Sequence, residues 1–309
     1  MRSINFNHGL AAVATAGLLS IPLALEAAPR SIRVASDGTA ITVSPTTSTA
    51  TITTTSATTT TTSTAGYNST LVNGYTPASL KFAGRPWRIN AGATWTSNLD
   101  HSVRMSSTAS KMRVELHNTE TDKTKSDSTG VRRAEFSGSL YGDPTRLPNK
   151  TSLWGAMSFK HQAWSDPVGM ATKQGGVYGQ VHIGSTFGGS PAVGFRRSKT
   201  GKFRITTRGE LSTASTIRYE APLSFDQPHD LVYNLVLDPV AGSLKVWLDG
   251  VKVVDVANVS IGSRYAESYF NAGAYFSGGI TCPVAAEYGN MVYPAPTSLF
   301  SRVSSRPAW

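Results

Sequence analysis

The stretch LKVWLDGVKVVDV, residues 244–256, indicates the fold class of this 309-residue chain. Two short runs rich in Val, Leu and Trp flank Asp249-Gly250. A two-residue turn between twisted strands needs positive φ angles, which an Asp-Gly pair readily adopts. We therefore expect residues 244–256 to form one antiparallel β-hairpin.

Other short runs of alternating polar and apolar residues follow Tyr67, separated by Gly, Pro, Asn and Asp. Almost no stretch is long enough for an amphipathic helix. Besides the hairpin, strands are predicted at 111–116, 132–136, 153–160, 177–183, 203–207, 231–237 and 269–276. So many strands in one domain predict an all-β fold of two stacked antiparallel sheets.

The start of the chain has the pattern of a secretory signal peptide. Arg2 precedes the uncharged stretch 9–25, and small residues follow up to Ala28. A membrane anchor is the alternative, but 17 residues interrupted by Pro22 are short for a span of about 20. We expect a signal peptide at 1–28, secretion to the periplasm or the extracellular space, and no membrane insertion of the mature chain.

Residues 29–66 are predicted to be a disordered linker, because 16 of the 20 residues 46–65 are Thr or Ser. This composition lacks the large apolar side chains that a folded core needs. Residues 67–309 then form a single domain, which we expect to be a monomer. Cys282 is the only cysteine, so packing must hold this domain together without an intramolecular disulfide.

The basic charge belongs to the predicted domain. Residues 67–309 hold 26 of the 29 basic and 17 of the 19 acidic residues, which leaves a net charge of +9. Such a surface attracts an anionic partner, and nucleic acid, acidic lipid and acidic polysaccharide all fit the charge alone. A nucleic-acid partner is not expected, because the chain has a signal peptide and no basic helix. No His and Cys spacing typical of a metal site occurs, so no metal is predicted.

Side chains two apart stand on one face of a strand, which converts spacing into a candidate surface. In 177–183 this rule places Tyr178, Gln180 and His182 together, opposite an apolar face. In 269–276 the corresponding polar face contains Tyr269, Asn271, Gly273 and Tyr275. Any solvated sheet has a polar face, but Tyr, Gln, His and Asn are less usual there than Lys, Glu, Thr and Ser. These faces therefore favour a carbohydrate-binding surface, and Gly273 is interpreted as leaving room for a ligand.

Two Arg-x-Glu pairs border this surface, Arg113 with Glu115 and Arg133 with Glu135. Arg113 and Glu135 are assigned to substrate binding. The alternative for Arg113 is a structural same-face ion pair with Glu115, and the alternative for Glu135 is to orient Arg133. Arg197 belongs to a group of arginines between residues 196 and 208 that is predicted to meet further carboxylates.

Three motifs resemble those of alginate lyases of polysaccharide lyase family 7. Arg133-Ala-Glu-Phe136, Gln180-Val-His182 and Tyr269-Phe-Asn-Ala-Gly-Ala-Tyr275 occur in the family's order. The family's patterns are Arg-(Ser/Thr)-Glu-Leu, Gln-(Ile/Val)-His and Tyr-Phe-Lys-Ala-Gly-x-Tyr-x-Gln. The second matches fully, whereas Asn271 replaces the Lys and Ser277 replaces the final Gln. The resemblance extends from about Asn68 onward. Glucuronan lyases and heparin-lyase-like proteins share the Arg-x-Glu layout.

The resemblance implies a concanavalin A-like β-jelly-roll sandwich with a concave substrate groove. It implies β-elimination of an acidic polysaccharide, most simply alginate, to 4,5-unsaturated uronate ends without metal or organic cofactor. Arg133, Gln180 and His182 would neutralise and position the substrate, and Tyr275 would act as base and acid. The residues predicted to bind substrate are Asn271, Tyr269, Tyr178, Arg113, Glu135 and Arg197.

β-Elimination removes the C5 proton of a uronate next to an ionised carboxylate, so that carboxylate must be neutralised. The planar fork of Arg133 and the amide of Gln180 suit this task. A tyrosine titrates near pH 10, so Tyr275 as base predicts an alkaline optimum. His182 as base, with Tyr275 as acid, is the alternative. The remaining alternatives are another polyuronate lyase of the same fold, such as a glucuronan lyase, and a non-catalytic carbohydrate-binding module.

Overall fold

The computed structural model describes residues 67–70, 74–75, 81–91, 103–106, 108–116, 132–138, 146–162, 175–183, 191–198, 200–210, 212, 214–264, 268–276 and 283–309. The predicted signal peptide (1–28) and linker (29–66) lie outside these residues, as do Ser277 and Cys282. The described elements belong to one compact unit, Thr61–Trp309.

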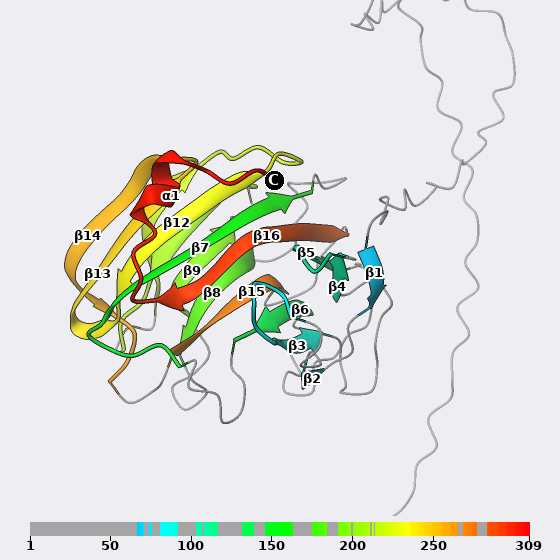
Figure 1. The fold of residues 1–309 in the computed structure, drawn as a ribbon. Helices are drawn as coiled ribbons and strands as arrows, with labels where there is room; N and C mark the ends of the chain where they lie inside the picture. Colours follow the sequence, from blue (N-terminus) through cyan, green and yellow to red (C-terminus); the bar gives the residue numbers. More distant parts are fainter. Residues whose placement is uncertain are drawn as a thin grey trace, which may run out of the picture. The chain divides into compact units, whose positions relative to one another are not determined.

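The described residues of this unit form two antiparallel eight-stranded sheets and one short helix (Figure 1). Sheet A has the order β1 (Tyr67–Thr70), β4 (Val103–Ser106), β5 (Lys111–Leu116), β16 (Val284–Ala295), β7 (Ser152–His161), β12 (His229–Val236), β13 (Asp238–Leu248), β14 (Val251–Ile261). Sheet B has the order β11 (Thr216–Ala221), β10 (Phe203–Thr207), β9 (Pro191–Arg197), β8 (Gly176–Ile183), β15 (Ser268–Phe276), β6 (Arg132–Ser137), β3 (Arg88–Ala91), β2 (Gly74–Tyr75). Helix α1 is Phe300–Ser304.

The predicted fold class is confirmed, and so is the hairpin from which it was inferred. Strands β13 and β14 pair from Leu248 and Val251 outward, on either side of Asp249 and Gly250. These two turn residues have φ angles of 53° and 84°, the positive values that a two-residue turn between twisted strands requires. Each predicted strand is present, with ends that differ by a few residues in most cases.

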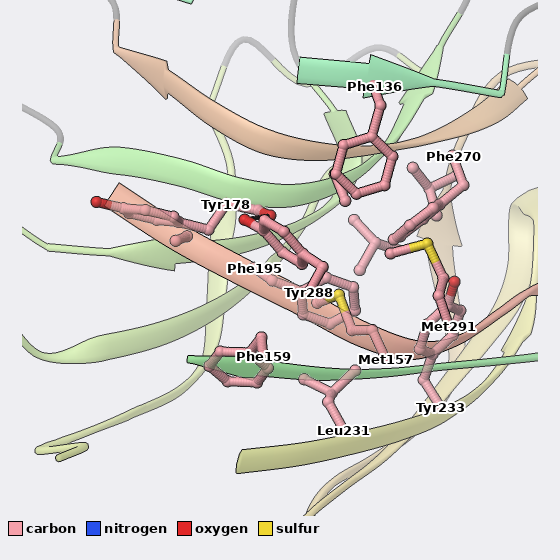
Figure 2. Close-up of a cluster of buried hydrophobic side chains, with 14 of the residues drawn as sticks. Phe136, Met157, Phe159, Tyr178, Phe195, Leu231, Tyr233, Phe270, Tyr288 and Met291 are labelled. Carbon is pink, nitrogen blue, oxygen red and sulfur yellow. Dashed lines mark hydrogen bonds between the residues drawn. The ribbon is translucent and has the colours of Figure 1, made fainter. Parts of the chain in front are cut away.

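The core fills the space between the two sheets. Side chains from both sheets form one apolar cluster. Figure 2 shows its centre, where Phe136, Phe195 and Phe270 of sheet B meet Met157 and Tyr288 of sheet A. Because burial of these inner faces is the main source of folding free energy, polar chemistry is confined to the outer faces.

The outer face of sheet A is covered in part by the C-terminal segment. Arg302 of α1 donates to Asp230 at 2.6 Å, and Phe300 packs edge-on against the stacked rings of Trp154 and Trp247. No helix within the described ranges is long and apolar enough to cross a membrane. This cover leaves the outer face of sheet B as the principal place for a ligand.

Candidate active site

The outer face of sheet B brings together the four predicted catalytic residues. Arg133 lies on β6, Tyr275 on the neighbouring β15, and Gln180 and His182 on β8 beyond it. Their strand neighbours, such as Ala134, Val181 and Ala274, point into the core. Tyr275 is the register partner of Arg133. Register partners on one face have Cβ atoms about 5 Å apart, so Arg133 and Tyr275 are direct neighbours, while Gln180 connects to Arg133 through Glu135.

Arg133 is anchored at one end and accessible at the other. Its Nε lies 3.3 Å from Oε2 of Glu135, and its Cζ lies 4.9 Å from the centre of the Tyr275 ring. The Arg133 side chain is 27% exposed, against 3% for Glu135. The accessible part of the guanidinium can therefore pair with an anion from solvent.

Glu135 holds two of these residues in place. Besides its ion pair with Arg133, it accepts a hydrogen bond of 2.7 Å from Nε2 of Gln180. Burial raises the pKa of Glu135, while the charge of Arg133 and the Gln180 hydrogen bond act in the opposite direction. Glu135 is 2% exposed, so this geometry fits the orienting role rather than direct contact with substrate.

His182 stacks on Tyr269, its register partner on β15, with ring centres 5.2 Å apart. Burial lowers the pKa of His182 to about 4, and the nearby charge of Arg133 acts in the same direction. The imidazole is therefore neutral at pH 7. Burial and the charge of Glu135 raise the pKa of Tyr269, which stays protonated.

Asn271 has a buried acceptor that no described residue satisfies. It faces Gln180 on one side and Ser137 on the other, and it is 5% exposed. Its Oδ1 has no hydrogen-bond partner among the described residues. A buried acceptor without a partner costs about 1–3 kcal/mol, so Asn271 is prepared for a donor supplied by a ligand.

The predicted contact between Tyr178 and substrate is wrong. Its ring lies in the core (Figure 2), and the residue is 1% exposed. The centre of the ring lies 4.0 Å from that of His161. The β8–β9 register shifts between Val177 and Gly179, so the strict alternation of faces is broken there. Val177 takes the place on the outer face that the pattern assigned to Tyr178.

The predicted substrate contact of Arg113 is also wrong. Arg113 lies on β5 of sheet A and is fully buried. Its guanidinium pairs with Glu115 at 2.8 Å and Glu287 at 3.3 Å, and it donates to Gln162 at 2.9 Å. The same-face ion pair, the alternative for this residue, is the arrangement present.

Arg197 lies on the inner side of β9 rather than on the predicted binding surface, and it is fully buried. It donates to Nδ1 of His161 at 2.9 Å and to the carbonyls of Gly201, Leu223 and Ser224. With all of its polar contacts inside the protein, Arg197 is a structural residue.

The interpretation of Gly273 is also corrected. A Cβ there would lie 2.3 Å from the carbonyl oxygen of Ala134 and 2.5 Å from Cα of Glu135, so the neighbouring strand, not a ligand, requires the glycine. Gly273 also has a φ of 141°, and the β8–β15 register shifts between Ala272 and Tyr275. This bulge positions Tyr275.

Gly273→Ala is therefore expected to lower the free energy of unfolding by about 2–4 kcal/mol, because backbone atoms cannot move away cheaply. Urea denaturation measures this loss. Gly289→Ala is the matched control, since its Cβ would meet nothing closer than 3.6 Å. Equal stability of the two variants would contradict this account of Gly273.

Acid is expected to destabilise the fold through His161 and His182. Burial and the charge of Arg197 hold the pKa of His161 well below its usual 6.5, and that of His182 is about 4. The unfolded chain therefore binds more protons below pH 6.5, so stability present above that pH is lost as pH falls. We expect a loss of about 2–3 kcal/mol between pH 7.5 and 5.5, from about 1.4 kcal/mol per unit for each histidine.

Urea denaturation at these two pH values tests the expectation. His182→Gln should show about half the loss of the unsubstituted protein, because one of the two histidines is gone. An unchanged free energy of unfolding from pH 7.5 to 5.5 would contradict the neutral, buried state of both rings.

The described ranges contain no group of three or more His, Cys, Asp or Glu side chains arranged to hold a metal ion.

The chain matches no protein-family model and no curated protein. It is similar in structure to family 7 alginate lyase A1-II′ solved with a substrate, at 12% sequence identity and a TM-score of 0.50, covering 69% of this chain and 94% of the other. It is also similar to an endo-β-1,4-glucuronan lyase from the fungus Trichoderma reesei (16% identity, TM-score 0.47, 75% and 94% covered) and to an alginate lyase from Corynebacterium sp. (16%, 0.46, 74% and 94%). The described unit therefore has the β-jelly-roll fold of a family 7 alginate lyase.

Proposed function

We propose that this protein is a secreted polysaccharide lyase that cleaves a uronate polymer, alginate in the first place, by β-elimination. The observation that carries this proposal is the cluster of Arg133, Gln180, His182 and Tyr275 on neighbouring strands of one sheet face. The shared fold supports it, since the family 7 alginate lyase of that fold was solved with a substrate bound. The net charge of +9 on residues 67–309 suits a polyanion.

Neutralisation of the substrate carboxylate is the first task of the site. The accessible end of Arg133 pairs with the carboxylate next to C5, while Glu135 holds its Nε. Gln180 has one amide hydrogen on Glu135 and a second one available for the same carboxylate. Both contacts strengthen as negative charge develops on the carboxylate in the transition state.

Tyr275 is the better candidate for the base. A base is most effective when its pKa lies near the working pH, and a His182 of pKa about 4 is too weak to remove a weakly acidic C5 proton. The guanidinium of Arg133 lies over the Tyr275 ring, so the proposed base stands next to the group that neutralises the substrate carboxylate. The phenolate takes the C5 proton, and the resulting phenol donates it to the leaving oxygen at C4. Neutral His182 positions the sugar by hydrogen bonding.

Ultraviolet absorbance tests the proposal, because β-elimination creates a conjugated unsaturated uronate. The secreted protein is mixed separately with polyguluronate, polymannuronate, glucuronan and heparin, with chelator present. Growth of absorbance on a uronate polymer is the expected result, and the responding polymer names the substrate. Silence on all four, with salt-sensitive binding retained, would contradict the lyase and favour a carbohydrate-binding module.

A further inference from the structure

Arg196 on β9 has a partly buried guanidinium on the outer face of sheet B, with no carboxylate partner among the described residues. Its Nε donates to Oγ1 of Thr206 at 3.2 Å. A Cβ added to Gly194 would lie 2.7 Å from the same Nε, so the side chain lies flat over that glycine. The Thr206 hydroxyl and the backbone of Gly194 thus fix the position of the guanidinium.

Other buried arginines in the described part of the chain are compensated. Arg113 pairs with two glutamates, Arg302 pairs with Asp230, and Arg197 donates to three backbone carbonyls. The ionisable neighbours of Arg196 are the two cations Arg204 and Arg208, and Tyr275, whose phenolate form would attract the guanidinium. Burial lowers the pKa of Arg196 to about 10, and the repulsion from Arg204 adds to this. A partly buried guanidinium without a carboxylate partner destabilises the fold, which points to a carboxylate that arrives from outside.

The position of Arg196 relates this anion to the candidate active site. Arg133, Tyr275, Val177 and Arg196 are successive register partners across β6, β15, β8 and β9. Three strand spacings separate Arg133 from Arg196, about 14 Å between their Cα atoms. Tyr275 stands between the two cations, and the separation exceeds the length of one sugar unit.

We propose that Arg196 binds the carboxylate of a second uronate, farther along the polymer than the uronate whose carboxylate pairs with Arg133. This inference rests on the proposed function. Two fixed cations on either side of Tyr275 select a chain that carries carboxylates on separate units at this spacing. A chain with a neutral sugar at the second place leaves Arg196 uncompensated and binds more weakly.

The test compares kcat and KM for the responding polymer among four variants. Arg196→Gln is expected to raise KM about 10- to 100-fold with little change in kcat, since a hydrogen-bonded charged contact is lost. Arg196→Lys keeps the charge without the fork and should give an intermediate KM. Gly194→Ala keeps every charge but displaces the guanidinium, so it should also raise KM. Arg306→Gln removes one exposed positive charge near Asp249 of sheet A and should leave KM unchanged.

Thermal unfolding distinguishes a ligand-binding arginine from a structural one, because the two predict opposite changes in Tm for Arg196→Gln. Removing a partly buried guanidinium without a carboxylate partner should leave Tm of Arg196→Gln unchanged or higher, whereas loss of a structural arginine lowers it. If the unsubstituted protein cleaves the polymer and KM is the same for Arg196→Gln and Arg306→Gln, this inference fails alone. If it binds without cleaving, and Arg196→Gln weakens binding, the proposed function fails and the second anion site stands. If the unsubstituted protein neither cleaves nor binds the polymer, both the proposed function and this inference are overturned.

Discussion

Tyr275→Phe is expected to lower kcat on the responding polymer by about 10³-fold or more. The substitution removes only the phenolic oxygen, so the ring under the Arg133 guanidinium and the packing of β15 are preserved. General acid or base catalysis contributes about 10²- to 10⁴-fold, and Tyr275 serves in both roles. Initial rates measured by ultraviolet absorbance give the loss, and KM should change little because the carboxylate contacts remain.

His182→Ala is the comparison that separates the two candidate bases. The pKa of His182, about 4, predicts that its loss costs less than that of Tyr275 and leaves the alkaline limb of the pH–rate profile in place. If Tyr275→Phe keeps activity within about tenfold while His182→Ala has none, the base is His182 and the assignment above is wrong.

Arg113→Met is expected to lower the free energy of unfolding by about 3–5 kcal/mol, because it removes the guanidinium that Glu115 and Glu287 share and leaves Glu287 paired with Lys160 alone. The folded fraction of this variant should keep the kcat and KM of the unsubstituted protein, since Arg113 lies in the other sheet from Tyr275. Urea denaturation and initial rates measure the two effects separately.

Arg133→Met is the matched variant from the second Arg-x-Glu motif, and it should show the opposite result. Turnover should be lost because the substrate carboxylate is no longer neutralised, while stability falls less, since Gln180 still bonds Glu135 and that carboxyl can take up a proton. Full activity in Arg133→Met would contradict the site, and undiminished stability in Arg113→Met would contradict the structural role of its ion pairs.

The two motifs show what local sequence can establish. Arg113-x-Glu115 and Arg133-x-Glu135 both place Arg and Glu on one face of a strand, as predicted. Nothing within either motif specifies which sheet the strand joins, because strand order depends on pairings between distant segments. Strand β5 lies in sheet A, where Arg113 and Glu115 form a structural ion pair. Strand β6 lies in sheet B, where Arg133 and Glu135 face the candidate site.

The faces of β8 and β15 were predicted correctly wherever the strands are regular. Gln180, His182 and Asn271 stand on the outer face because a pleated strand alternates with a period of two, and Tyr275 keeps that face through its regular pairing with β6. Tyr178 departs from this rule at a register shift, and a bulge has no signal in the alternation itself.

The described strands without a predicted counterpart are β1, β2, β3, β4, β9, β11 and β16, and β9 and β16 show two different reasons. β9, with the sequence PAVGFRR, was not predicted, so the adjacent Arg196 and Arg197 could not be assigned to opposite faces. β16 was missed because Glu287, Gly289 and Asn290 interrupt its apolar pattern, and the β7–β16 register shifts just after them. Long-range pairing, rather than local propensity, stabilises β16 between β5 and β7.

The most direct test of the central claim is mass spectrometry of the products formed in ¹⁸O-labelled water. β-Elimination breaks the C4–O bond without adding water, so the account predicts new uronate ends that are one water lighter than saturated ends and carry no label. Tyr275→Phe should form none of them. Saturated ends that carry the label would show hydrolysis and would contradict the lyase mechanism.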